Sequence, residues 1–127
     1  MQIHVEKVKD KNVYGSTQFG NIRVIWEGNS PEIDKSYFVE LDIEGVYTWG
    51  KDITLSCDNK CSILCDDKSI CLTGTLESVD DDGYAVLRME DFIIPILTQG
   101  TSFEVNSIIE IRVNLMSAFP VSFDLNS

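Results

Sequence analysis

The chain has 127 residues, of which 43% are hydrophobic and 24% charged. This composition excludes global disorder, collagen and coiled coil, and it predicts a single globular domain over residues 1–127. Ten basic and twenty-one acidic side chains leave a net charge of −11, which disfavours binding to nucleic acid or to an anionic membrane. Residues 1–6 lack the basic region and apolar core of a secretory signal, so we expect a cytoplasmic protein.

The first third of the chain alternates apolar and polar residues with a period of two, which predicts strands. Residues 3–5 and 22–26 indicate the first two strands. The segment 15–20 contains two glycines but lacks the Gly-Lys-Ser/Thr ending of a phosphate-binding loop, so we expect a flexible connection between these strands. Residues 37–43 show the cleanest alternation and predict a strand with one apolar and one acidic face.

The second half of the chain also favours strands. Residues 52–91 indicate a meander whose strongest hairpin signal is the Asp-Asp-Asp-Gly sequence at 80–83. The apolar run 93–97 contains a proline, which predicts an edge strand or an extended crossing segment. Residues 109–115 indicate a last long strand, and we expect 116–127 to be an extended tail packed on the body. No window favours a helix of more than one turn.

Many short strands with regularly spaced turns predict an all-β fold, either a small antiparallel barrel or a sandwich. We favour the barrel because closure removes exposed strand edges. Residues 72–88, LTGTLESVDDDGYAVLR, resemble the central hairpin of small OB-like barrels. In such barrels a glycine allows one strongly bent strand to serve two sheets, so this resemblance implies an OB-like barrel.

Four cysteines, Cys57, Cys61, Cys65 and Cys71, lie close together at the spacing C-x3-C-x3-C-x5-C. This spacing differs from the C-x2-C pairs of common zinc sites. A disulfide between Cys57 and Cys61 and a metal site are both alternatives. We expect reduced thiols that fill the barrel interior as small apolar residues, with no metal and no cofactor.

Catalytic patterns are sparse. His4 is the only histidine, and no acidic residue lies near it at a telling spacing, so we expect a surface residue and no catalytic site. The acidic run 80–82 fails the calcium-loop pattern, which requires a carboxylate at Ser78 and a glutamate at Met89. A solvated hairpin tip is expected instead.

A candidate binding surface lies on the acidic face of the strand 37–43. Phe38 has the same parity as Glu40, Asp42 and Glu44, so these four side chains should project outward in one row. An aromatic ring among carboxylates suits a site for a cationic protein. The turns contribute five further acidic candidates at the flanks: Asp66, Asp67, Asp80, Asp81 and Asp82.

In size, acidity and all-β character the chain resembles bacterial immunity proteins that neutralise toxin nucleases. This resemblance implies a non-enzymatic inhibitor that masks a basic protein partner. Fifteen acidic and five basic side chains lie in residues 32–91, and such an excess would speed the encounter with a basic protein. The alternative is an OB-like barrel module of a larger protein assembly, in which acidity serves only solubility.

Overall fold

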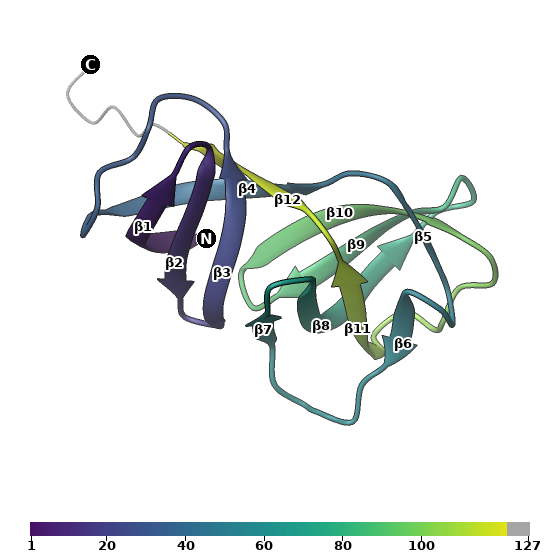
Figure 1. Cartoon of the computed structure of the whole chain (residues 1–127). Coiled ribbons are helices and arrows are strands. Elements are labelled where there is room, and N and C mark those ends of the chain that lie inside the picture. The colour runs from purple at the N-terminus through teal and green to yellow at the C-terminus, as the bar shows by residue number, and fades with distance from the viewer. Residues whose placement is uncertain (122–127) are drawn as a thin grey trace, which may run out of the picture.

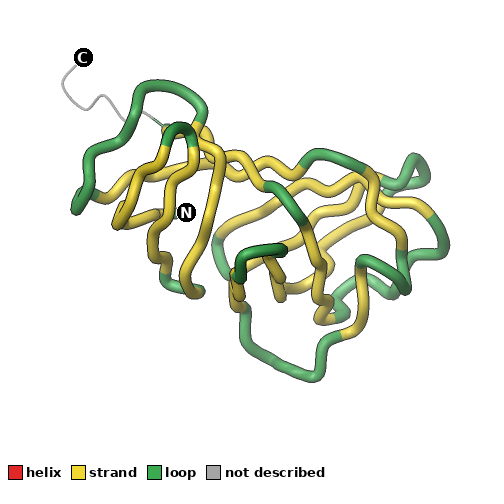
Figure 2. The backbone as a smooth tube through the Cα atoms, in the orientation of Figure 1, coloured by secondary structure: helices red, strands yellow, loops and turns green. Residues whose placement is uncertain are grey.

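The computed structural model describes residues 1–121, which form strands, turns and loops without a helix (Figures 1 and 2). The predicted all-β class is therefore confirmed, and within these residues no helix could span a membrane. The strands of the described part are β1 (Gln2–Lys9), β2 (Asn12–Thr17), β3 (Gly20–Trp26), β4 (Ser36–Ile43), β5 (Val46–Thr48), β6 (Ile53–Leu55), β7 (Ser62–Cys65), β8 (Ile70–Val79), β9 (Tyr84–Met89), β10 (Phe92–Gln99), β11 (Ile108–Val113) and β12 (Met116–Pro120).

The N-terminal strands and β12 form a closed barrel in the order β1-β2-β3-β12-β4. Five is also the strand number of OB-type barrels. All neighbours are antiparallel except β3 and β12, which are parallel. A bulge between Val5 and Lys7 bends β1, which pairs with β2 and, through its first residues, with β4. This bend allows one strand to close the barrel.

The intervening strands form a second, curled sheet in the order β5-β10-β9-β8-β11-β6, with β7 beside β8. Its edges meet through a bridge between Trp49 and Ile53. Strand β8 pairs with β7 before Gly74 and with β9 after it, so a glycine does mark the point where one long strand changes partner. The hairpin 72–88 therefore lies in this second sheet, outside the closed five-stranded barrel.

The segment 15–20 is not a flexible loop, contrary to expectation. Asn12–Thr17 is the regular strand β2, which forms hairpins with both β1 and β3. Val13 is fully buried, and Gly15 lies so close to β1 that a Cβ there would collide with the His4 carbonyl oxygen. The close packing requires glycine at this position, and glycine removes the apolar side chain that would have marked the alternation.

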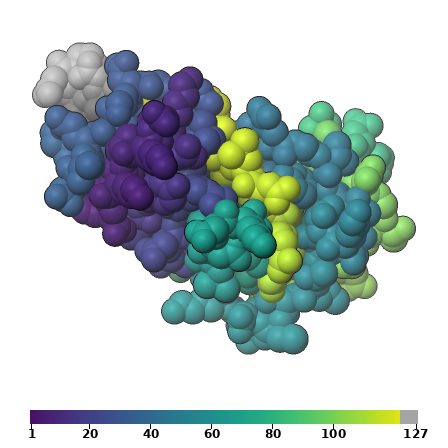
Figure 3. Space-filling view, viewed as in Figure 1, coloured from purple at the N-terminus to yellow at the C-terminus, as the bar shows by residue number. Residues whose placement is uncertain are grey.

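Two further connections differ from the expected meander and tail. Strand β6 pairs with β11 and does not pair with β7, so only β7 to β10 form a continuous meander. Within the expected tail 116–127, Met116–Pro120 is the strand that closes the first barrel, and residues 122–127 lie outside the described part. Figure 3 shows the surface of the final strands between the N-terminal barrel and the second sheet. The buried apolar side chains of both sheets form one hydrophobic cluster.

Substitution of Gly74 by alanine should destabilise the fold. A Cβ at this position would lie 2.6 Å from the Arg88 carbonyl oxygen and 2.9 Å from Cδ1 of Leu87. Because a backbone oxygen cannot rotate away, Gly74→Ala should lower the free energy of unfolding by about 1–3 kcal/mol, measured by urea denaturation. The exposed control Thr101→Ala should stay within about 0.5 kcal/mol of the parent. Equal stability of both variants would contradict the proposed close packing.

Candidate binding groove

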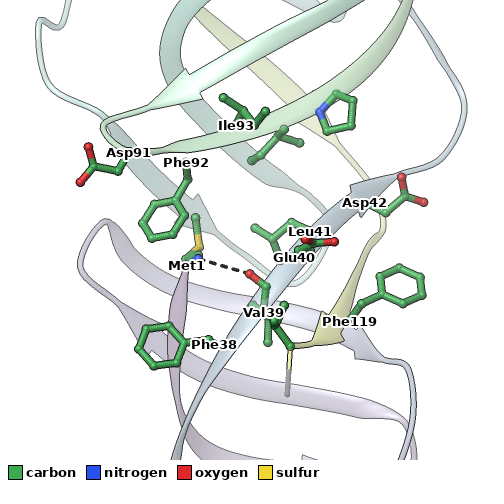
Figure 4. A pocket seen from close by; sticks show the side chains of 13 residues that line it. Met1, Phe38, Val39, Glu40, Leu41, Asp42, Asp91, Phe92, Ile93 and Phe119 are labelled. Atoms are coloured by element: carbon green, nitrogen blue, oxygen red, sulfur yellow. Dashed lines mark hydrogen bonds between the residues drawn. The ribbon is translucent and has the colours of Figure 1, made fainter. Parts of the chain in front are cut away.

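A groove of about 690 Å³ runs between the outer face of the first barrel and the second sheet (Figure 4). One wall comes from β4 and the end of β12, and the other from the β9–β10 turn and the first half of β10. The groove therefore lies where two segments far apart in sequence, 38–42 and 91–95, approach each other. Its volume is in the range of typical binding sites.

Strand β4 presents the predicted row to this groove. Val39, Leu41 and Ile43 are buried in the barrel, so the alternating positions of β4 face outward. Phe38 is 50% exposed, Glu40 is exposed and Asp42 is half-buried, and all three line the groove. Glu44 is also exposed but follows the end of β4, and it lies beside a separate hollow formed with Tyr47 and Arg112. The groove thus contains three of the four residues of the row.

The acidic flanking candidates do not join the row. Asp66 and Asp67 lie in the β7–β8 turn, where their carbonyl oxygens accept hydrogen bonds from Nη1 of Arg23, each at 3.1 Å. The Asp66 carboxylate accepts hydrogen bonds from the backbone N–H groups of Lys68 and Ser69, which lower its pKa below the usual value. Its carboxylate therefore holds this turn in shape.

The hairpin tip Asp80–Asp82 is also remote from the groove. Oδ1 of Asp80 accepts hydrogen bonds from the N–H groups of Asp82 and Tyr84, both at 2.9 Å, so it organises the turn. Gly83 follows the tip and accepts a hydrogen bond from the N–H of Thr98 near the end of β10. The groove, in contrast, lies at the beginning of β10. The tip and the groove are thus at opposite ends of the β9–β10 hairpin.

The sequence alone did not reveal two parts of the groove: the wall opposite β4 and the contribution of β12, which pairs with β4. Asp91 belongs to the β9–β10 turn, Ile93 is 59% exposed, and Phe119 of β12 is 44% exposed. Phe119 pairs with Glu40 across the β4–β12 ladder, so the two side chains project from the same face. An alternating assignment of the run 93–97 would have placed Ile93 outward. Its position opposite β4 depends on tertiary structure.

The groove has an apolar surface and an acidic rim. Its acidic side chains are Glu40, Asp42 and Asp91, and the part of its lining that the structure describes includes no Lys, Arg or His. The side-chain ion pairs found within residues 1–121 involve other acids, Asp34, Glu32 and Glu77. The N-terminal ammonium of Met1 also lines the groove, where it donates a hydrogen bond to the Val39 carbonyl oxygen and attracts Glu40. Asp42 and Asp91 are therefore the rim carboxylates best placed for a cation supplied from outside the chain.

His4 has polar neighbours that the sequence did not indicate. Its Nδ1 lies 3.1 Å from Oγ of Ser36, and its Nε2 lies 3.9 Å from Oδ1 of Asp34. The second distance exceeds that of a hydrogen bond, and the Asp34 side chain is 87% exposed. Water therefore competes for this carboxylate, and Asp34 does not orient the imidazole as a catalytic triad requires.

The cysteines fill the interior only in part: Cys61 and Cys65 pack against the hydrophobic core, but none of the four is fully buried. Cys57 is exposed, Cys61, Cys65 and Cys71 are half-buried, and all four are free thiols. Strand β6 ends before Cys57, so this residue lies in a loop. Cys71 alternates with two buried residues on β8 and therefore points outward. Among residues 1–121, no three His, Cys, Asp or Glu side chains are arranged to hold a metal ion.

Cys71 should be the least reactive of these thiols. Its Sγ donates a hydrogen bond to Oε1 of Glu110 at 3.0 Å, and burial together with this carboxylate raises the pKa of Cys71 to about 12. Timed alkylation with iodoacetamide, read by peptide mass mapping, should modify Cys71 at least about tenfold more slowly than Cys57. Glu110→Gln should accelerate it, and Glu104→Gln should not. Equal rates at Cys57 and Cys71 in the parent would refute the assignment.

Comparison with known proteins gives no information on what the groove binds. No protein-family model, no curated protein and no solved structure matches this sequence or fold. Its chemical character therefore follows from its own residues, which combine exposed aromatic and aliphatic side chains with three carboxylates, the N-terminal ammonium of Met1 and no Lys, Arg or His side chain in the described lining.

Proposed function

We propose that the protein is a non-enzymatic, acidic binding protein that masks a basic protein partner. In its most specific form the proposal is an immunity-type inhibitor of a toxin nuclease, acting in the cytoplasm. The observation that carries it is the groove between the two sheets, where exposed apolar side chains are bordered by Glu40, Asp42 and Asp91. Protein interfaces commonly combine an apolar centre with a polar periphery.

The apolar part of the groove supports a binding role. Phe38, Ile93 and Phe119 are each about half exposed and line one continuous concave surface. Removing such side chains from water is favourable by roughly 25 cal/mol per Å² of apolar area. An exposed aromatic residue in a concave site, with other apolar side chains around it, is the usual anchor of a protein interface.

The charge distribution supports a basic partner. The three rim carboxylates belong to residues 32–91, which hold most of the acidic excess of the chain. A field of this sign accelerates the approach of a cationic protein and disfavours an anionic one. Nucleases have cationic surfaces for their substrate, and the resemblance in size, acidity and all-β character to immunity proteins favours a toxin nuclease among basic partners.

A second candidate is a barrel module of a larger assembly. Leu64, which is 68% exposed, and Leu55 are large apolar side chains outside the groove. Stable multi-subunit contacts would cover such residues. Substitution of Leu64 by serine distinguishes the two candidates, because it should weaken an assembly that uses this surface and leave an inhibitor that uses the groove unchanged.

Reversal of the row charges should reduce association with the partner. The partner is first captured from the native host and then purified. The double variant Glu40→Lys, Asp42→Lys should lower the association rate by about tenfold or more near 50 mM salt, and the difference should shrink near 500 mM, since salt screens exposed charges. Stopped-flow or surface-based kinetics measure both rates. Glu104→Lys, exposed in the β10–β11 loop, is the charge-matched control. If the double variant binds like the parent at both salt concentrations, this face is not the interface.

Truncation of the Phe38 side chain should change mainly the rate of dissociation from the partner. Phe38→Ala removes apolar contact area and leaves the charges unchanged. It should therefore raise the dissociation rate and weaken binding by about 1–3 kcal/mol, with little change in association. Circular dichroism should remain that of the parent because Phe38 lies outside the barrel core. A change confined to the association rate would exclude Phe38 as an anchor.

A further inference from the structure

The groove also indicates what kind of segment it receives, an inference that rests on the proposed function. We infer that the groove binds an extended segment of a basic protein, with one large apolar or aromatic side chain and a lysine or arginine on each side of it. The inference draws on the two apolar walls, the placement of the rim carboxylates and the position of Pro95 in β10.

The centre of the groove suits a single apolar anchor. Phe38 and Phe119 lie on the wall formed by the first barrel, and Ile93 lies on the opposite wall (Figure 4). Backbone pairing holds the first wall in place, because Phe119 pairs with Glu40 and the N–H of Val121 donates to the Phe38 carbonyl oxygen at 2.8 Å. The aromatic rings are therefore presented from a regular sheet, which favours a preorganised site.

The carboxylates lie on both sides of this centre. Figure 4 shows Asp91 at one end of the groove and Asp42 at the other, with Glu40 between them on β4. A bound segment with cations on both sides of its anchor would thus have a carboxylate near each cation. A segment with acidic residues there would bring like charges together, at a cost in binding free energy.

Strand addition at β10 is disfavoured by Pro95. Residues 92–96 of β10 pair with β9 on one side, and β5 begins to pair with the other side only at Leu97. Pro95 lies within this stretch, which has no second neighbouring strand among residues 1–121. A proline is tolerated in such a ladder where its nitrogen faces away from the neighbouring strand, so Pro95 removes a hydrogen-bond donor from the edge. The segment is therefore recognised through its side chains, without extending the sheet.

Charge argues against the two occupants that this protein itself could supply. Residues 122–127 follow the groove-lining Val121 in the chain, and their sequence, SFDLNS, contains Asp124 and no Lys or Arg. A second copy of the chain would bring a net charge of −11 against the same acidic rim. A cationic segment from another protein satisfies both the apolar walls and the carboxylates.

The test uses synthetic peptides and needs no natural partner. The probe is GKKGWGKKG with blocked ends, and the controls replace its tryptophan by alanine or its lysines by glutamate. Titration calorimetry should detect binding of the probe and of neither control. Addition of the probe should change the amide chemical shifts of the full chain mainly at residues 38–42 and 91–95. Ile93→Ser and Phe119→Ala should each weaken the probe by about tenfold, and the matched exposed variant Leu64→Ser should not. Asp91→Lys should weaken it at low salt, whereas Glu104→Lys should have little effect.

Several results would overturn the inference. Equal binding of the probe and its alanine control would do so, and so would chemical-shift changes that lie outside the groove. Binding of the probe only after residues 122–127 are removed would make those residues the occupant. A dimer in sedimentation that Ile93→Ser dissociates would assign the groove to a second copy. Loss of probe binding with intact binding of a captured basic partner would refute this inference and leave the proposed function standing. If the probe binds but no basic partner protein is found, the proposed function would be refuted and the peptide specificity of the groove would stand.

Discussion

Closure of the first barrel by β12 is the constraint on which the rest of the structure depends. This strand pairs in parallel with β3 and antiparallel with β4, and without it both neighbours would have an open edge. Its inward side chains, Met116 and Ala118, are buried in the core, and its outward Phe119 lines the groove. One short strand thus completes the barrel and supplies part of the binding surface, so stability and recognition are coupled through it.

The same closure explains how the second sheet is placed. Strands β5 to β11 form an insertion between β4 and β12, and the two ends of this insertion are adjacent because Met116 pairs with Ile43. The insertion returns to where it left the barrel and packs there, with β10 close to β4 and one shared hydrophobic cluster. The groove is the surface of this junction, and its two walls come from the two sheets.

The fold class could be predicted from local alternation, because strands such as β4 and β11 have one buried face and one polar face. Local alternation failed at β2, where Gly15 replaces an apolar side chain, and at β12, which is short and contains serine and proline. Alternation also cannot specify which strands pair, and so the expected pairing of β6 within the meander was wrong. For the same reason the outward row on β4 was visible in the sequence, whereas the wall opposite it was not. The acidic turns at Asp66 and Asp80 looked similar to the row in sequence, but their carboxylates stabilise their own turns.

The order of the strands along the chain has a consequence for folding during synthesis. Strands β7 to β10 pair with neighbours close in sequence, so this meander can form as soon as it leaves the ribosome. Strands β3 and β4, in contrast, wait for Met116–Pro120, which is translated last of all the described strands. Until then their unpaired edges are open to other nascent chains. Completion of the N-terminal barrel thus comes after synthesis of the whole second sheet, and a chain interrupted before residue 116 has a first barrel that cannot close.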